Sequence, residues 1–198
     1  MSGVRWSLAG PLWGGHAIGV AVANEGEHVD GRDWLMATER LRFGIWRDDD
    51  IALAEAIWGD AEVTEMTGGP FSTSDVAERL SAEIENWRRY HVQYWPVFQL
   101  SGPTLVGCCG LRPRDMEARI AELGFQLCRQ SWGQGYASEA SRAVIEWART
   151  HDFVTLIAGH HPSNHASKRA LVRLGFSYTH DELYPPTGLM EPCYSLLL

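Results

Sequence analysis

The order in which two hydrophobic periodicities follow one another is the feature that most constrains the fold of this chain. Segments with alternating apolar residues, typical of strands, and segments with apolar residues every three or four positions, typical of helices, follow in the order β-α-α-β-β-β-α-β-α-β-β. Strands and helices interleaved in this way bury the faces of a sheet against helices. The sequence therefore predicts a layered α/β domain with a mixed sheet.

The expected elements have recognisable ends. Three acidic residues at 48–50 lie where a helix dipole favours negative charge, and Gly175 can end the last helix in the left-handed conformation. The patterns predict about seven strands, at residues 41–45, 96–100, 105–111, 120–128, 154–158, 176–184 and 193–198. They also predict about four helices, which begin near residues 51 and 72 and cover 136–149 and 165–174.

Residues 1–37 differ from the rest of the chain because they are glycine-rich and show no clear periodicity. We expect them to form a poorly ordered N-terminal extension, and the folded domain to span residues 38–198. A misassigned start codon is one alternative. A cleaved signal peptide is another, because residues 21–23 (AVA) resemble a signal-peptidase site, although Arg5 is the one positive charge before it and Gly14-Gly15-His16 interrupt the apolar stretch.

The charge balance and the cysteines limit the partners and the location. The chain carries 17 basic and 25 acidic residues, a net charge of −8, whereas proteins that bind nucleic acids are usually basic. No apolar run approaches the roughly 20 residues that a membrane span requires. The four cysteines form no CxxC pair, which favours a reducing, cytoplasmic location. We therefore expect no nucleic-acid or membrane partner, and the sequence leaves a monomer and a homodimer open.

Two glycines, Gly133 and Gly135, lie between a strand that ends near Cys128 and a helix that begins near Tyr136. Glycines at such a junction let backbone N–H groups approach an anion, and the helix N-terminus adds partial positive charge. A phosphate or pyrophosphate is therefore the expected ligand. The spacing matches neither GxxxxGK[ST] nor the full GxGxxG motif, which argues against a P-loop NTPase and a Rossmann dehydrogenase.

The segment Gln130-x-x-Gly133-x-Gly135 resembles the Q/R-x-x-G-x-G/A motif of the GNAT acetyltransferases, which holds the pyrophosphate of acetyl-CoA. Four further segments resemble the RimJ/RimL branch of that family, the ribosomal-protein N-terminal acetyltransferases. They are Thr38-Glu39-Arg40-Leu41, Glu122-Leu123-Gly124-Phe125, Gly135-Tyr136-Ala137-Ser138-Glu139-Ala140, and Asn164-x-x-Ser167 followed by Leu174-Gly175-Phe176. The matches are ordered, correctly spaced and spread over about residues 38–198.

The resemblance implies a GNAT-like fold, in which a mixed, mostly antiparallel sheet splays apart between its fourth and fifth strands and is flanked by helices. It implies acetyl-CoA as co-substrate, with the pantetheine arm in the gap and one backbone N–H group polarising the thioester carbonyl. The residues that it implies for binding acetyl-CoA are Leu127, Cys128, Arg129, Gln130, Gly133, Gln134, Gly135, Tyr136, Ala137, Asn164 and Ser167.

Fewer residues are candidates for catalysis. Glu122 lies beside the expected acceptor cleft and is a candidate base that deprotonates an ammonium through water; a structural salt bridge or a solvent-facing position is the alternative. Ser167 is a candidate hydrogen-bond donor to the thioester sulfur. Many GNAT enzymes place a tyrosine acid four residues before the glycine of their GF pair, where this chain has Leu171. Asn164 can bind pantetheine, cap the following helix, or do both.

Three histidines, His160, His161 and His165, suggest a metal site at first sight. However, Pro162 prevents their presentation on one helix face, and no acidic ligand is adjacent. We therefore expect no metal, and a loop histidine that aids proton removal stays an alternative.

The expected function is transfer of an acetyl group from acetyl-CoA to a primary amine by direct attack in a ternary complex. The acceptor is a protein N-terminus or a small-molecule amine, and a longer acyl donor is a close variant. A non-catalytic acyl-CoA-binding or sensory domain and a structural module with purely conformational glycines are the other classes. An α-amino group has a pKa of about 7.7–8.0 and a lysine side chain about 10.4. Because the sequence shows no strong base, we expect α-amino acceptors to react faster than lysines.

Overall fold

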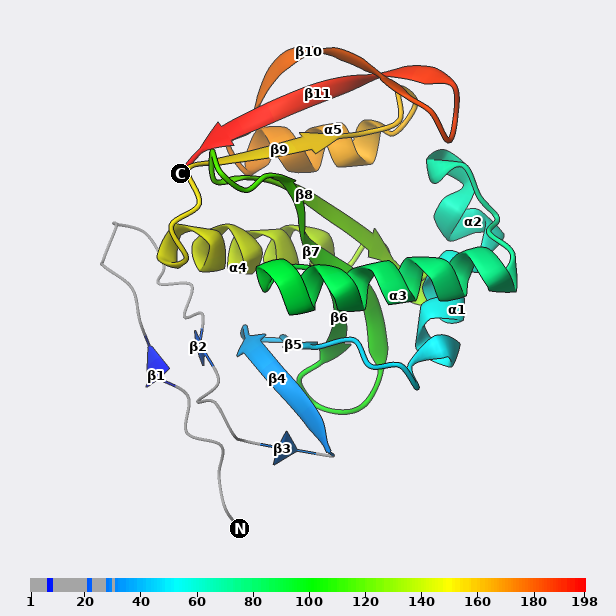
Figure 1. The fold of residues 1–198 in the computed structure, drawn as a ribbon, viewed down its shortest axis with the longest axis vertical. Helices are drawn as coiled ribbons and strands as arrows, with labels where there is room; N and C mark the ends of the chain where they lie inside the picture. Colours follow the sequence, from blue (N-terminus) through cyan, green and yellow to red (C-terminus); the bar gives the residue numbers. More distant parts are fainter. Residues whose placement is uncertain (1–6, 9–20, 23–27, 30) are drawn as a thin grey trace.

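One sheet runs through the molecule in the computed structural model, which describes residues 7–8, 21–22, 28–29 and 31–198. Its strands follow in the order β1-β2-β4-β5-β6-β7-β8-β9-β11-β10, and β3 pairs with β4 outside this path (Figure 1). The parallel pair is β8 with β9, and the other described pairs are antiparallel. The strands are β1 Ser7–Leu8, β2 Ala21–Val22, β3 His28–Val29, β4 Arg32–Ala37, β5 Leu41–Gly44, β6 Tyr94–Gln99, β7 Leu105–Asp115, β8 Ile120–Leu127, β9 Thr155–Gly159, β10 Ser177–Tyr184 and β11 Leu189–Leu197. The predicted mixed, mostly antiparallel sheet is confirmed.

The helices begin where the sequence predicts, and one short helix is additional. They are α1 Ile51–Trp58, α2 Ala61–Thr64, the 3₁₀ turn η1 Glu65–Thr67, α3 Thr73–Tyr90, the 3₁₀ turn η2 Arg129–Ser131, α4 Tyr136–Thr150 and α5 His165–Arg173. A capping box between Ser72 and Asp75 fixes the start of α3. The additional helix, α2, has four residues and is capped by Asp60, so it is too short to show a helical period.

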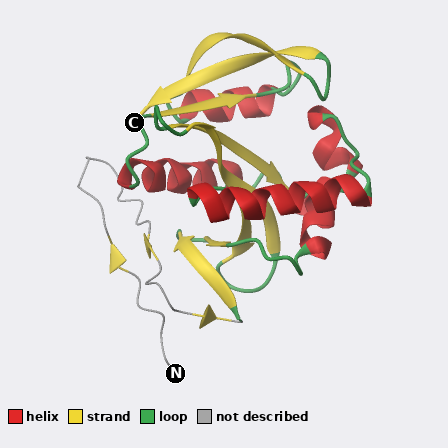
Figure 2. Ribbon diagram, in the orientation of Figure 1, coloured by secondary structure: helices red, strands yellow, loops and turns green. Residues whose placement is uncertain are grey.

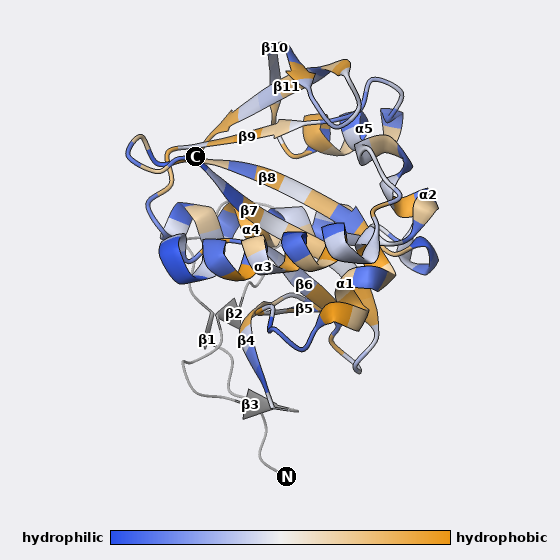
Figure 3. Cartoon of the chain, turned by 45° about the vertical axis from the view of Figure 1, so that its right-hand side comes forward, coloured by the Kyte–Doolittle hydropathy of each residue, from blue (hydrophilic) through white to orange (hydrophobic). Residues whose placement is uncertain are grey.

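Helices cover both faces of the sheet (Figures 1 and 2). Ile57 of α1 and Leu80 of α3 belong to a hydrophobic cluster on one face. Val144 of α4 and Leu171 of α5 belong to the cluster on the other face. Figure 3 shows hydrophobic and hydrophilic residues mixed along α3, as expected of a helix with one buried side. The sheet is therefore the middle layer of the predicted α/β domain.

The parallel pair β8–β9 opens toward the carboxyl end of β8. Pairing runs from Ile120 opposite Thr155 to Glu122 opposite Ile157, whereas β8 continues to Leu127. On its other edge β8 is paired with β7 as far as Leu127. The predicted splay between these two strands is therefore confirmed, and one edge of residues 123–127 has no strand partner in the described part of the chain.

The sheet begins earlier in the sequence than the expected boundary at residue 38. β4 pairs with β5 and lies inside the predicted extension. Its first residue, Arg32, is buried, and its Nη1 donates to Asp50 Oδ2 at 2.8 Å. The sequence did not predict this strand, because its buried and exposed side chains do not alternate along the chain. The features of a signal peptide that involve Arg5, Gly14-Gly15-His16 and Ala23 lie outside the described residues.

None of the helices that the structure describes combines the length and the apolar character needed to cross a membrane.

Candidate active site

The loop before α4 has the geometry of an anion-binding cradle. Gly133 and Gly135 adopt φ angles of +73° and +79°, in the left-handed region that favours glycine. A Cβ atom would meet no described atom within 4 Å at Gly133, and only Arg40 Nη2 at 3.7 Å at Gly135. Gly135 is the N-cap of α4 and provides no side-chain cap. The N–H groups of the first turn of α4 form the positive end of a 15-residue helix, and the glycines before them leave open space.

Residues between β4 and β5 hold this loop in place. Arg40 donates from Nε to Glu139 Oε2 at 2.7 Å and from Nη1 to the Gln134 carbonyl at 3.1 Å. Its guanidinium lies 4.6 Å from the centre of the Tyr136 ring. Thr38 Oγ1 donates to Glu139 Oε1 at 2.5 Å. The sequence motifs that contain Thr38, Arg40 and Glu139 indicated a family, but they did not indicate that these residues contact one another.

The unpaired edge of β8 leads into the cradle. The Cys128 N–H donates to the Val106 carbonyl at 2.9 Å on the side of β7. Bonded and non-bonded pairs alternate in an antiparallel ladder, so the backbone groups of Phe125 and Leu127 point to the open edge. The Leu127 carbonyl accepts a hydrogen bond from Trp132 Nε1 at 2.8 Å. The Leu127 N–H therefore points to the open edge, where an extended ligand can pair with it.

The remaining loop residues predicted to bind acetyl-CoA lie around the cradle. Gln134 Nε2 donates to the Gln130 carbonyl at 2.6 Å, which closes the loop on itself. Arg129 forms an exposed ion pair with Glu62 at 2.5 Å. Cys128 is buried, and burial raises the pKa of its thiol to about 11. The side chain of Cys128 is therefore neutral, and it belongs to the hydrophobic cluster that also contains Ile57 and Leu80.

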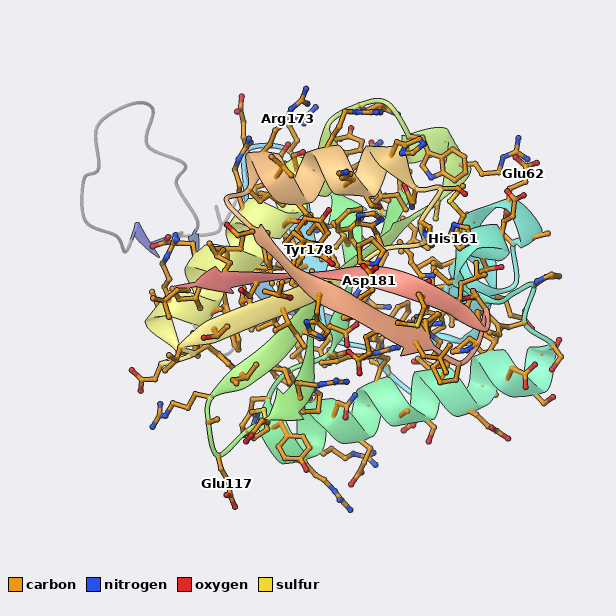
Figure 4. All side chains as sticks on the ribbon, turned by 90° about the horizontal axis from the view of Figure 1, so that it is seen from above. Glu62, Glu117, His161, Arg173, Tyr178 and Asp181 are labelled. Atoms are coloured by element: carbon orange, nitrogen blue, oxygen red, sulfur yellow. The ribbon has the colours of Figure 1, made fainter. Side chains whose placement is uncertain are left out.

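A cleft of about 510 Å³ opens where β8 and β9 separate. We call it the acceptor cleft. It is lined by β8, β9, α3, the start of α5 and the β10–β11 hairpin, and Glu122, Asn164, Ser167 and Leu171 are among its wall residues. Figure 4 shows the hairpin from above, with Tyr178 and Asp181 on β10 and His161 labelled near the start of α5. The structure thus brings both predicted catalytic residues, Glu122 and Ser167, into one cavity.

Glu122 is partly buried in the acceptor cleft, and its Oε1 accepts a hydrogen bond from the Tyr94 hydroxyl at 3.2 Å. Burial, followed by the charge of Glu122, raises the pKa of Tyr94 well above its usual value. Tyr94 is therefore a neutral donor at physiological pH. Glu122 makes no ion pair among the described residues, so the structure shows no salt bridge for it there.

Asn164 caps α5, as one of the two interpretations predicted. Its Oδ1 accepts a hydrogen bond from the Ser167 N–H at 3.0 Å. The cap uses the amide oxygen, so the amide NH₂ group remains as a donor toward the acceptor cleft. Leu171 is 2% exposed and belongs to both the core and the cleft wall. The position at which the family resemblance implies a tyrosine acid therefore offers no proton here.

The three histidines of the sequence motif are not among the groups of close potential metal ligands in the described residues. His160 is buried, and its Nδ1 lies 2.9 Å from the His161 carbonyl. In the part of the chain that the structure describes, the group with suitably close potential ligands is instead His180, Glu182 and Cys193. There Arg114 already holds Glu182 at 2.9 Å.

Several charged residues of the acceptor cleft could not be recognised as site residues from the sequence. Arg79 from α3, Arg112 from β7 and Glu191 from β11 all line it. Because they come from distant segments, only the folded chain brings them together, and no local spacing can reveal them.

Comparisons with known proteins agree with this geometry. A profile of the acetyltransferase (GNAT) domain matches residues 40–177. The protein YkkB of Bacillus subtilis (strain 168) is 28% identical over 147 residues, covering 73% of this chain and 86% of YkkB. RimL, a ribosomal L7/L12 α-N-protein acetyltransferase solved in complex with coenzyme A, has a TM-score of 0.72 at 16% identity, covering 84% of this chain and 98% of that chain. MccE, the microcin C7 self-immunity acetyltransferase in complex with acetyl-CoA and AMP, has a TM-score of 0.69 at 13% identity, covering 81% and 93%.

The structural matches show the shared fold, and the profile match extends over well over half of the sequence. The chain therefore belongs to the GNAT family of acetyltransferases.

Proposed function

We propose that this acetyltransferase moves the acetyl group of acetyl-CoA to a primary amine by direct attack in a ternary complex. The observation that carries the proposal is the continuity of the unpaired edge of β8. At one end it reaches the cradle at Gly133 and Gly135, and at the other it reaches Glu122 in the acceptor cleft. One extended molecule can therefore lie with its phosphates at α4 and its thioester beside an amine at Glu122.

The binding roles follow from what each group can donate. The first-turn N–H groups of α4 and the glycine loop would bind the pyrophosphate. The Leu127 N–H at the open edge would pair with the pantetheine arm, and a backbone N–H beside it would polarise the thioester carbonyl. The amide NH₂ of Asn164 would bond to the arm from the other side of the gap. Tyr136 and Ala137 contribute backbone groups, because they begin α4.

The chemical roles are a base and a weak donor. Glu122 accepts a proton from the ammonium, directly or through water, while Tyr94 fixes one of its oxygens. Ser167 would donate a hydrogen bond to the departing sulfur. Because a thiol has a pKa of about 8.5, the thiolate is a tolerable leaving group without a strong acid. The substitution of Leu171 for a tyrosine is therefore compatible with turnover.

The setting that we propose is the cytoplasm, with the protein acting as a monomer or homodimer. All four cysteines are free, three of them buried, which supports a reducing compartment.

The test is a thiol-release assay with acetyl-CoA against a panel of small amines and N-terminal peptides. We expect amine-dependent release of CoA thiol and a matching N-acetylated product by mass spectrometry. Binding of acetyl-CoA without turnover of any amine would instead support a non-catalytic acyl-CoA-binding domain. Failure to bind acetyl-CoA would overturn the proposal entirely.

A further inference from the structure

The acceptor cleft contains more charged groups than a generic amine requires. Two of its arginines are neutralised by carboxylates. Arg112 Nε donates to Glu83 Oε1 at 2.8 Å, and Arg112 Nη2 donates to the same oxygen. Arg114 Nη2 donates to Glu182 Oε1 at 2.9 Å. Three other charged groups of the cleft have no ion pair among the described residues. They are the guanidinium of Arg79 and the carboxylates of Glu122 and Glu191.

The guanidinium of Arg79 is held firmly but is not neutralised. Its Nη2 donates to Gln126 Oε1 at 2.8 Å, and its Cζ atom lies 4.7 Å from the Trp58 ring centre. Gln126 is itself fixed by Trp58 Nε1 at 3.0 Å. The Nε atom of Arg79 is buried without a hydrogen-bond partner among the described residues, and burial lowers the pKa of the guanidinium. A pre-positioned guanidinium of this kind suits a carboxylate, which it can bind in a forked geometry.

Glu191 is a carboxylate in the same cleft. It is 9% exposed, and its Oε1 is buried without a partner among the described residues. Burial, and secondarily the charge of Glu122, raises the pKa of Glu191. Two carboxylates that disfavour one another's charge are stabilised by a cation between them. An ammonium group is such a cation.

All these charges act on the same part of the cleft. Burial raises the pKa of Tyr184, the positive charges of Arg79 and Arg112 oppose this rise, and the negative charges of Glu191 and Glu122 add to it. Tyr184 therefore lies within electrostatic reach of both kinds of uncompensated group.

We infer that the acceptor is a zwitterion of the amino-acid type, whose ammonium is bound by Glu122 and Glu191 and whose carboxylate is bound by Arg79. This inference rests on the proposed function, because it concerns the acceptor of that same reaction. Arg79 and Glu191 are then specificity-determining residues, and Glu122 keeps its role as base. A zwitterion adds one positive and one negative charge to the one guanidinium and two carboxylates of the cleft. One carboxylate charge then remains in excess, and proton removal needs such a carboxylate.

The test compares amino acids with amines that lack the α-carboxylate. The acetylation of serine, methionine and glutamate is measured against that of their α-amides, with 1,4-diaminobutane as an amine that lacks a carboxylate. We expect kcat/KM for each amino acid to exceed that for its α-amide by about tenfold or more, as for a charge-assisted hydrogen bond. Glutamate α-amide retains only its side-chain carboxylate, so it distinguishes a free amino acid from a peptide that begins with an acidic residue.

Variants of Arg79 and Glu191 test which residue binds the carboxylate and which binds the ammonium of the amino acid. Arg79→Gln should raise KM for the amino acids about tenfold and affect KM for the α-amides much less, so that the preference disappears. Arg79→Lys, which keeps the charge but not the fork, should retain part of the preference. Glu191→Gln should raise KM for amino acids and α-amides alike. The matched controls are Arg88→Gln on the exposed side of α3 and Glu117→Gln, which points away from the molecule in Figure 4.

Each outcome has a separate meaning. Acetyl-CoA binding, measured on every variant, shows that the fold is intact independently of the acceptor. If α-amides or diaminobutane react as well as amino acids in the unmodified protein, or if Arg79→Gln and Arg79→Lys both keep the preference, the inference is wrong while the proposed function stands. If acetyl-CoA binds and no amine reacts, both the proposed function and this inference fall.

Discussion

At the scale of single residues, the contact between Tyr94 and Glu122 defines which of the two groups can act as a base. Because burial raises the pKa of Tyr94, its hydroxyl stays protonated and donates to Glu122. Glu122 is therefore an acceptor in this contact and has lone pairs left for a proton from the substrate.

Replacing Glu122 with glutamine should lower the acetylation rate more at neutral pH than at pH 9. The test uses a peptide or α-amide acceptor, whose α-amino group has a pKa of about 7.7–8.0, so most of it is already free amine at pH 9 and needs no base. We expect a loss of about 10²-fold at pH 7, typical of general-base catalysis, and a smaller loss at pH 9. Steady-state rates across this range test it. An equal loss at every pH would make Glu122 a positioning residue, and no loss would leave it structural.

At the scale of elements, the N-terminus of α4 depends on the backbone of Gly135. Its φ angle of +79° is one that a β-branched residue resists, and the helix has no side-chain cap to take over its role. The glycine loop is also tied to the start of β5 through Arg40 and Glu139. The cradle is therefore a joint product of two elements that are far apart in the sequence.

Gly135→Val should weaken CoA binding more than it harms folding. Gly188 offers a matched control, because it has a φ angle of +67° and no described atom within 4 Å of an added Cβ but lies in the β10–β11 turn. Both substitutions should cost about 1–3 kcal/mol of folding free energy through backbone strain. Titration calorimetry with CoA should then show a loss of affinity for Gly135→Val only. Normal binding by a folded Gly135→Val protein would disprove the phosphate-cradle interpretation.

Elements with a clear period or cap could be predicted from the sequence, and the others could not. α3 was predictable because its capping box and apolar positions are local. β4 was not, because its side chains are buried in an irregular pattern that follows from its neighbours rather than from its own sequence. The same division holds for the site. Gly133, Gly135 and Ser167 belong to contiguous motifs, whereas Arg79 and Glu191 meet only through the tertiary fold.

At the scale of the whole molecule, the ion pair between Arg32 and Asp50 joins β4 to the start of α1. Both side chains are at least nine-tenths buried. Arg32→Ala would leave a buried carboxylate without its partner, which typically costs roughly 3–5 kcal/mol. Chemical denaturation should show this loss, whereas Arg88→Ala, at an exposed position, should change little. A truncation that removes residues 1–33 should be destabilised in the same way, because it deletes Arg32. An unchanged unfolding midpoint in Arg32→Ala would show that β4 contributes little to the fold.

Ligand binding should stabilise the molecule as a whole, because the cradle, the open edge of β8 and the acceptor cleft come from different segments of one domain. A ligand that binds only the folded state adds RT ln(1 + [L]/Kd) to its stability, about 2.7 kcal/mol at a concentration of one hundred times Kd. Acetyl-CoA should therefore raise the melting temperature by several degrees in a thermal shift assay. NAD and ATP should do much less at the same concentration, because they share the adenosine diphosphate part of CoA but lack the pantetheine arm that would pair with the edge of β8. An equal or larger shift with NAD would mean that the adenosine diphosphate part alone accounts for binding, and the assignment of acetyl-CoA to this site would be wrong.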